Sequence, residues 1–391
     1  MSAFRKLKAL ALGQNTDIDL TAAQLQSAAI PVSDAPCRGC ADPCDEGKNP
    51  QPRSGHDEYP KFDVDMETEM LGSREWEWDA EARAQIVIST GKSDWVREVT
   101  DAKGTLAAYV DELSSSGRPP KDKDSKKPKD KGAAPGPGAA APTANGGSAA
   151  HVPGVHDSAN LAKHKKVTIL NGSHRTVCHD DEKETVLVFP DYKVVTEVDR
   201  SHEGAEQLWN HAVSPHVDLH AVPEGATTVR SWVIPYSCVI LLCSHKRRDN
   251  RCAIAAPKLQ HALTVALERE GWEVHTQPDD PSIHGPALEE LSGTEDEKQA
   301  AVLEKLKEVH PTVAQEKRAL ILFCSHIGGH KYAGNVIINT PRGVSVWYGR
   351  VTPHEVDAIV KETIIGGKIL PALLRGGLNL CYPGHKSLND W

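Results

Sequence analysis

Residues 236–271 read YSCVILLCSHKRRDNRCAIAAPKLQHALTVALEREG and show the clearest pattern in the chain. Their first part, 236–243, is a short apolar run with the length and composition of a buried β-strand. Residues 253–271 carry leucines at helical spacing and end in a glycine, which predicts a helix that stops there. Cys243 and Cys252 bracket eight polar residues between these two elements. The stretch therefore predicts a strand, a loop flanked by thiols, and a helix.

The last third of the chain continues this pattern. Residues 318–324, RALILFC, predict a second buried strand, and the segments 335–340 and 344–349 predict a strand hairpin. Residues 352–365 predict a helix that opens with a capping box and a proline. A charged helical segment within 285–317 is expected to be an insertion. Strand, helix, strand, loop, hairpin and helix follow the order of the thioredoxin fold with one helix missing, so the predicted fold class is α/β.

The first part of the chain is harder to interpret. A Lys/Asp run and an Ala/Pro/Gly tract begin at residue 116, and such a composition cannot bury enough apolar surface to offset the entropy of ordering. We predict three parts in all. They are a flexible, cysteine-containing segment over 1–59, an α+β domain over 60–235 that a disordered low-complexity insertion at 116–165 interrupts, and a thioredoxin-like domain over 236–391.

Composition narrows the function classes. The chain has 391 residues and a formal net charge of −9, whereas nucleic-acid binding needs a basic surface. No stretch reaches the roughly 18 consecutive apolar residues of a membrane span, so we expect neither a nucleic-acid nor a membrane partner. Nine cysteines, an odd number, without a secretory cleavage pattern indicate a reducing compartment. Clustered cysteines there bind metal or carry out redox chemistry more often than they form disulfides. We expect the protein in the cytoplasm.

Two histidines follow the second apolar run, in the segment SHIGGHKYAG at 325–334. His326 and His330 are separated by three residues that include Gly328 and Gly329, so this segment predicts a tight loop rather than a helix. A strand–helix–strand connection implies neighbouring parallel strands, and both loops would then leave the same edge of the sheet. The carboxyl ends of strands are where α/β proteins bind ligands. Two thiolates and two imidazoles could therefore meet at one centre.

Spacing alone leaves several interpretations of this set open. A disulfide is disfavoured by the reducing compartment and leaves the histidines without a role. Zinc binds two Cys and two His as a tetrahedron, although eight residues between the cysteines exceed the usual two to four. A [2Fe–2S] cluster with two Cys on one iron and two His on the other is the Rieske arrangement, and the long loop suits its width. Zinc and the cluster are about equally supported, beside unrelated thiols and core histidines.

Three motifs together resemble the sucrase/ferredoxin-like family: LCSHKRRDNRC at 242–252, HIGGHKYAGNV at 326–336 and WYGRVTP at 347–353. The resemblance is strong from about residue 236 onward and faint before it. It implies a thioredoxin-like ferredoxin domain over 236–391 that binds a [2Fe–2S] cluster. In the histidine-bearing branch of the family, the ligands correspond to Cys243, Cys252, His326 and His330. Classical members of the wider fold have cysteine at the last two places. Mitochondrial relatives of similar pattern make the mitochondrion the alternative location.

The resemblance implies a one-electron carrier that serves a redox partner protein, rather than an enzyme. Two alternatives from other classes are a zinc-stabilised interaction module and a thioredoxin-type thiol oxidoreductase. The oxidoreductase class carries its thiols as CxxC at a helix start, which the eight intervening residues do not match. The chain ends in SLNDW, and an acidic residue before the terminal Trp391 resembles the signal by which cytosolic iron–sulfur proteins engage their assembly machinery. That machinery is the second expected partner.

Residues beside the motifs receive secondary roles. Ser244 and His245 could donate hydrogen bonds to a cluster, and Cys238 and Cys324 are expected to be small buried side chains. Four basic residues could offset cluster charge, dock an acidic partner or simply be solvated: Arg248, Arg251, Lys331 and Arg350.

The N-terminal stretch CRGCADPC, at 37–44, is a separate cysteine cluster. Its three thiols could form a second metal site with His56 or Cys178, or they could be exposed thiols in a flexible segment. The sequence assigns Cys37, Cys40 and Cys44 no definite role.

Overall fold

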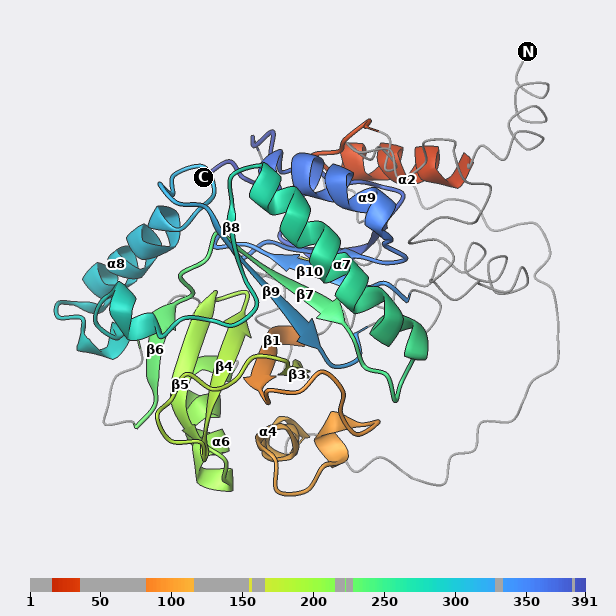
Figure 1. The fold of residues 1–391 in the computed structure, drawn as a ribbon. Coiled ribbons are helices and arrows are strands. Elements are labelled where there is room, and N and C mark those ends of the chain that lie inside the picture. Colours follow the sequence, from red (N-terminus) through yellow and green to blue (C-terminus); the bar gives the residue numbers. More distant parts are fainter. Residues whose placement is uncertain are drawn as a thin grey trace, which may run out of the picture.

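Figure 1 shows the computed structural model of the chain. The structure describes residues 16–35, 82–115, 155–156, 166–214, 222, 228–327, 333–381 and 384–391. Several sequence predictions fall outside these ranges. They include the low-complexity insertion at 116–165, apart from residues 155–156, the cysteine cluster at 37–44, the predicted ligand His330 and its neighbour Lys331.

Twelve strands form one mixed sheet within the described ranges. The strands are β1 (Ala82–Ser89), β2 (Val155–His156), β3 (Lys166–Gly172), β4 (Lys183–Phe189), β5 (Lys193–Asp199), β6 (Arg230–Val233), β7 (Cys238–Cys243), β8 (Glu273–His275), β9 (Arg318–Cys324), β10 (Val336–Asn339), β11 (Ser345–Tyr348) and β12 (Leu374–Leu378). Their order is β2-β12-β11-β10-β7-β9-β3-β1-β4-β5-β6, and β8 pairs with β9.

Helices cover this sheet. The α-helices are α2 (Thr16–Ser27), α4 (Leu106–Ser115), α6 (His202–Leu208), α7 (Asn250–Arg269), α8 (Glu295–Glu308) and α9 (Pro353–Ala358). Shorter 3₁₀ helices are η1 (Val99–Asp101), η3 (Pro281–His284) and η4 (Leu288–Glu290), and π-helical turns are η2 (Trp209–Val213) and η6 (Ile359–Ile365). In the part of the chain that is described, no helix is both long and apolar enough to cross a lipid bilayer.

The C-terminal half has the thioredoxin strand order, β11-β10-β7-β9. β7 and β9 are parallel, β10 is antiparallel to β7, and β11 is antiparallel to β10. α7 follows β7 and α9 follows β11, and the described residues between β9 and β10, 325–327 and 333–335, contain no helix. The predicted α/β fold is therefore confirmed. The charged segment expected to be a helical insertion contains α8.

Helix α7 begins at Asn250, earlier than the leucine spacing predicts, and so includes Cys252 in its first turn. Asp249 is the N-cap residue, and its carboxylate accepts a hydrogen bond from the Arg251 backbone N–H at 3.0 Å. This bond satisfies one of the donors that a helix start leaves unpaired. The cap lies inside the polar loop, where the apolar periodicity gives no signal. One thiol of the predicted site is consequently part of a helix terminus.

The N-terminal half repeats the same order of elements. β1, α4 and β3 form a parallel strand–helix–strand unit, β4 and β5 follow as an antiparallel pair beside β1, and α6 comes last. The order β3-β1-β4-β5 corresponds to β9-β7-β10-β11 in the C-terminal half. The sequence predicted only an unspecified α+β domain here. Because one sheet continues across residue 235, the division of the chain into domains stays a prediction.

The two halves meet at the carboxyl ends of β3 and β9. These strands are antiparallel and share the single residue pair Gly172↔Cys324. Immediately beyond this pair, the Ser325 backbone N–H donates to the Asn171 carbonyl oxygen at 2.8 Å. Since both strands end at this point, the loops that leave the carboxyl edge of each half lie against one another.

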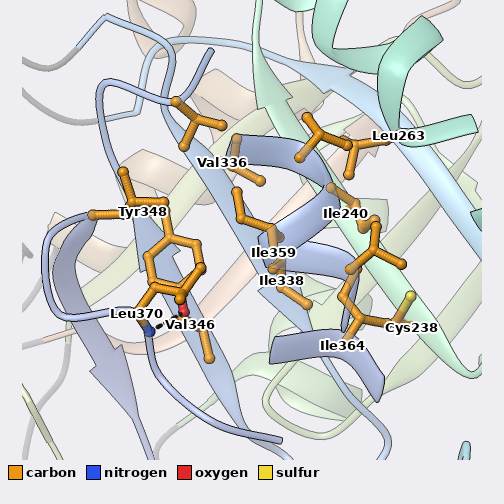
Figure 2. Packing of buried hydrophobic residues seen from close by; sticks show 14 of the residues in the cluster. Cys238, Ile240, Leu263, Val336, Ile338, Val346, Tyr348, Ile359, Ile364 and Leu370 are labelled. Atoms are coloured by element: carbon orange, nitrogen blue, oxygen red, sulfur yellow. Dashed lines mark hydrogen bonds between the residues drawn. The ribbon is translucent and has the colours of Figure 1, made fainter. Parts of the chain in front are cut away.

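The C-terminal half of the sheet is buried on both faces. α7 and α9 lie over one face (Figure 1), where Ile240 packs with Leu263 of α7 and Ile359 of η6 (Figure 2). Cys238 belongs to this packed cluster and is a small buried side chain, as predicted. Side chains alternate along a strand, so Cys243 faces the other way and packs in a second cluster. The Cys243 side chain thus points to the face opposite α7 and α9, where it packs with Cys252 from the first turn of α7.

Candidate metal centre

Cys243 and Cys252 lie close together, at the end of β7 and in the first turn of α7. Cys243 is the last residue of β7, and each cysteine is 2% exposed. The two sulfur atoms share a hydrogen bond, which is the main reason that the pKa of Cys243 is well below its ordinary value in spite of burial. The same hydrogen bond and burial raise the pKa of Cys252. The hydrogen bond thus favours the thiolate form of Cys243 and the protonated form of Cys252.

Two groups of the loop after β9 also reach the Cys243 sulfur. The His326 side chain and the Ile327 backbone N–H both hydrogen-bond to it and lower its pKa further. The loop begins beside the thiolate because β7 and β9 pair in register, with Cys243 opposite Cys324. The structure thus brings together Cys243, Cys252 and His326. His330 lies outside the described residues, and within those residues no group of three or more His, Cys, Asp or Glu side chains is arranged to hold a metal ion.

The far end of the same loop approaches the second thiol. The Gly334 backbone N–H hydrogen-bonds to the Cys252 sulfur and partly offsets the rise in the pKa of that thiol. Gly334 has a φ of +90°, and a Cβ added to it would lie 2.6 Å from the Val351 carbonyl oxygen. Conformation and space both require glycine here. The chain can therefore bring a backbone donor to Cys252 at a place where any side chain would push it away.

His245 connects the N-terminal half to the loop that carries His326. It is 1% exposed, and its Nε2 lies 3.0 Å from the Trp95 carbonyl oxygen. A carbonyl only accepts, so Nε2 carries the proton and Nδ1 accepts the hydrogen bond from the His326 backbone N–H at 3.2 Å. Ser244 Oγ donates to the Ser93 carbonyl oxygen at 2.8 Å. The structure thus uses both side chains to hold loops together, not as the predicted donors to a cluster.

The arginines of the thiol loop are paired with acidic residues. The pairs are Arg247 with Asp94 at 3.5 Å, Arg248 with Glu98, and Arg251 with its neighbour Asp249 at 2.7 Å. The first two pairs again join this loop to residues 90–98, which follow β1. Sequence reasoning gave that segment no role because its own pattern carries no motif. These pairs show that Arg248 and Arg251 serve the local structure; Lys331 lies outside the described residues.

The equivalent place in the N-terminal half carries no cysteine. ILNGSH at 169–174 corresponds to ILFCSH at 321–326, and Ser89 ends β1 where a cysteine ends β7. The His174 ring lies over Gly172, since a Cβ on that glycine would be 2.6 Å from His174 Nδ1. Burial lowers the pKa of His174 to about 4, so the ring is neutral. At this place the N-terminal half thus has a buried neutral imidazole, at the position that corresponds to His326, and no thiol.

The family model described as sucrase/ferredoxin-like matches residues 78–376. The chain belongs to this family. The family prediction is confirmed, and the match begins long before residue 236, where the motifs alone indicated only a faint resemblance. The family region therefore includes both repeated halves of the sheet.

Curated fungal relatives agree with this assignment. The chain is 32% identical to Altered inheritance of mitochondria protein 32 of Clavispora lusitaniae over 171 residues, which are 44% of this chain and 46% of that protein. It is 32% identical to the protein of the same name from Debaryomyces hansenii, over 50% of this chain and 60% of that protein. It is 29% identical to Actin patches distal protein 1 of Saccharomyces cerevisiae, over 32% of this chain and 29% of that protein. The chain thus spans less than two thirds of each of these relatives, and no solved structure matches it significantly.

Proposed function

We propose that the protein transfers electrons through a [2Fe–2S] cluster held by Cys243, Cys252, His326 and His330. The observation that supports this most is the meeting of a buried, hydrogen-bonded thiol pair with the His326 side chain at the carboxyl edge of two parallel strands. Two Cys and two His are the donor set of a Rieske-type centre. The family name, which contains the word ferredoxin, supports the same chemistry. When bound, the cluster supplies a one-electron couple whose potential lies above that of a four-cysteine ferredoxin.

The surroundings of the thiols favour the negative charge that thiolate ligands bring. α7 has 20 residues, and Cys252 lies in its first turn, where the helix dipole stabilises negative charge. The Ile327 and Gly334 backbone N–H groups hydrogen-bond to the two sulfurs. His245 fixes the backbone of His326 from the other side. These groups are in place without any side-chain rearrangement, so the site fits two thiolate ligands.

A thioredoxin-type thiol oxidoreductase is the second candidate function. One observation favours it: a thiol pair with a lowered pKa of Cys243 lies at the start of a helix in a thioredoxin-like fold. Such enzymes also need an accessible sulfur that a substrate can attack. Both sulfurs here belong to cysteines that are 2% exposed. The burial favours ligands over nucleophiles, and a zinc-stabilised module is the third possibility that the same donors allow.

Iron and sulfide analysis, together with low-temperature EPR, tests the proposed function. We expect the purified full chain to be reddish-brown, to contain iron and acid-labile sulfide in equal amounts, and to give, after reduction, an EPR signal with the average g value of mixed His/Cys ligation. Colourless protein that contains zinc would support the interaction module. Metal-free protein whose thiols exchange with a disulfide substrate would support the oxidoreductase.

The reduction potential is expected to fall as the pH rises. A ligating imidazole keeps a second ring nitrogen that can carry a proton. Reduction adds negative charge at the site, so this nitrogen of His326 and His330 holds its proton more firmly in the reduced protein. Electron uptake is then accompanied by proton uptake, and a lower proton concentration disfavours it. Potentiometric titration at several pH values should give a slope of up to about 59 mV per pH unit. A potential that stays constant through the neutral and alkaline range would contradict histidine ligation.

The C-terminal tail supports a second proposal, that Trp391 engages the cytosolic iron–sulfur assembly machinery. Asn389 Nδ2 donates to the Ile364 carbonyl oxygen at 2.9 Å, which holds the tail on η6. Trp391 itself is 43% exposed, and its ring packs edge-on against His310 with 5.1 Å between centroids. A tail that is anchored before its last residue presents an aromatic ring to a receptor at a small entropic cost.

Deletion of Trp391 should lower the iron content of protein purified from cells without unfolding it. The deletion removes one half-exposed ring and leaves the Asn389 anchor in place. We expect the iron content to fall by half or more while the melting temperature of the cluster-free protein changes little. Trp391→Phe, which keeps an aromatic ring, is the matched control and should retain most of the iron. If the protein without Trp391 kept its full iron content, the proposal that the tail engages the assembly machinery would be wrong.

The cytoplasm is the proposed location, because this tail proposal requires the cytosolic machinery. The mitochondrion is the alternative, since the printed names of two relatives refer to the inheritance of mitochondria. The redox partner that donates or accepts the electron is a separate protein whose identity the site does not specify.

A further inference from the structure

Asn335 is a buried amide beside the candidate metal centre. Its residue is 2% exposed, and among the described residues neither its Nδ2 nor its Oδ1 has a hydrogen-bond partner. Burial of an unpaired amide is unfavourable because the amide loses its hydrogen bonds to water, so such groups are rare in folded proteins. Neither polar atom of this side chain makes a hydrogen bond within the described residues. This indicates that the amide binds a group that the polypeptide itself does not supply.

The strand register places Asn335 next to Cys243. The Cys243 backbone N–H donates to the Asn335 carbonyl oxygen at 3.2 Å, which continues the antiparallel pairing Val336↔Leu242 of β10 and β7. Residues directly opposite in antiparallel strands project to the same face, with Cβ atoms about 4.5–5.5 Å apart. Cys324 lies opposite Cys243 on its other side. The Asn335 side chain therefore belongs to the face that carries the thiol pair.

A comparison within β10 shows that burial alone does not explain this amide. Asn339 is 1% exposed and, four residues along the same strand, lies on the same face at the opposite end. Its Oδ1 accepts a hydrogen bond from Ser345 Oγ, although its Nδ2 has no partner among the described residues. Asn335 has no partner for either polar atom within the same residues, and it directly follows Gly334, whose backbone N–H already hydrogen-bonds to Cys252.

We infer that Asn335 is a positioning residue whose side-chain N–H donates a hydrogen bond to a sulfur atom of the bound cluster, either a ligand thiolate or a bridging sulfide. This inference rests on the proposed function. Hydrogen bonds to sulfur stabilise the more negative, reduced state and so raise the reduction potential. The amide thus has its partner only when the cluster is bound.

Four full-length proteins test this inference: the wild type, Asn335→Leu, Asn335→Thr and Asn339→Leu. Leucine has nearly the shape of asparagine without polar atoms, threonine keeps one donor in a residue suited to a strand, and Asn339→Leu is the matched control. We expect the potential of loaded Asn335→Leu to fall by the equivalent of about tenfold in the equilibrium constant for reduction, about 59 mV. Asn335→Thr should lie between it and the wild type, and Asn339→Leu should match the wild type.

Thermal melting of the cluster-free proteins is the second measurement. Here the Asn335→Leu change should raise the melting temperature, whereas in the loaded protein it should lower the reduction potential. Removing an unpaired buried amide should stabilise cluster-free Asn335→Leu and raise its melting temperature by about 1–3 °C, because a long chain has a large unfolding entropy and its melting temperature shifts little. Asn339→Leu leaves the Ser345 hydroxyl unpaired and should melt lower. If Asn335 had a purely structural role, cluster-free Asn335→Leu would melt below the wild type, as Asn339→Leu should.

The outcomes separate this inference from the proposed function. Wild-type protein without iron and sulfide would overturn both. Loaded Asn335→Leu with the potential of the wild type, or cluster-free Asn335→Leu that melts lower than the wild type, would overturn the inference alone. Asn335→Leu could bind no iron and yet melt higher than the wild type when cluster-free. The loss of iron would then support the inference, because it would show that cluster binding requires the Asn335 side-chain donor.

Discussion

Cys243→Ser is expected to leave the purified protein almost free of iron, whereas Cys324→Ser retains the wild-type iron content. The two cysteines face each other in register at the ends of β7 and β9 and are both buried on the same face, which makes them a closely matched pair. They differ in their sulfur partners. Cys243 receives hydrogen bonds from Cys252, His326 and Ile327, whereas burial raises the pKa of Cys324.

Iron analysis and visible absorption of the two variants, purified side by side, measure this difference. Serine replaces a soft thiolate by a weakly acidic hydroxyl, which is a poor ligand for an iron–sulfur cluster. Thermal melting of the cluster-free proteins controls for folding, because both changes place a hydroxyl in a buried site and should cost similar stability. Equal iron in both variants, or loss from Cys324→Ser alone, would refute the assignment of Cys243 as a ligand.

His245→Leu is expected to lower the free energy of unfolding by about 2–6 kcal/mol, since it leaves two buried groups unpaired at about 1–3 kcal/mol each. These groups are the Trp95 carbonyl oxygen and the His326 backbone N–H. The change also removes the edge-on contact between the Trp95 and His245 rings, whose centroids are 5.7 Å apart. Because one of the released groups belongs to a predicted ligand, iron content should fall along with stability.

Urea denaturation of the cluster-free protein measures the loss, with His202→Leu as the control. His202 lies on the surface and pairs with Glu206 at 3.4 Å, an exposed pair that contributes little. His245→Asn should be intermediate, because its side-chain oxygen can accept from His326 N–H while the bond to Trp95 is lost. A His245→Leu variant as stable as His202→Leu would mean that the halves hold together without this histidine.

The C-terminal fold could be predicted from sequence because its elements carry their own signals. The apolar runs that became β7 and β9 are each flanked by polar loops, and the capping box at Thr352 with a following proline marks the start of α9. The adjacent glycines after β9 predict a tight loop, and both lie outside the described residues. Short strands without such a pattern, β8 and β12, were not anticipated.

The sequence predicted that Cys243, Cys252 and His326 meet, which the structure shows, but it did not predict which residues support them. Cys243, Cys252 and His326 stand out because thiols and imidazoles have a recognisable chemistry. Trp95 carries no such signal, and it meets His245 across 150 residues of sequence. Contacts of that kind follow from the packing of the two halves, which spacing along the chain does not encode. The repeat in the N-terminal half was hidden for a related reason, because the insertion at 116–165 separates α4 from β3 and serine and glycine replace the thiol positions.

Two copies of one element order, joined edge to edge, are what the duplication and fusion of a single ancestral gene would leave. After such an event the copies can specialise independently. The C-terminal half carries the sulfur donors, whereas the N-terminal half has Ser89 and Gly172 at the corresponding strand ends and contacts the other half through the loop after β1. Substitutions far from the metal site, in the copy that has no thiol there, are therefore expected to reach the redox chemistry through these contacts.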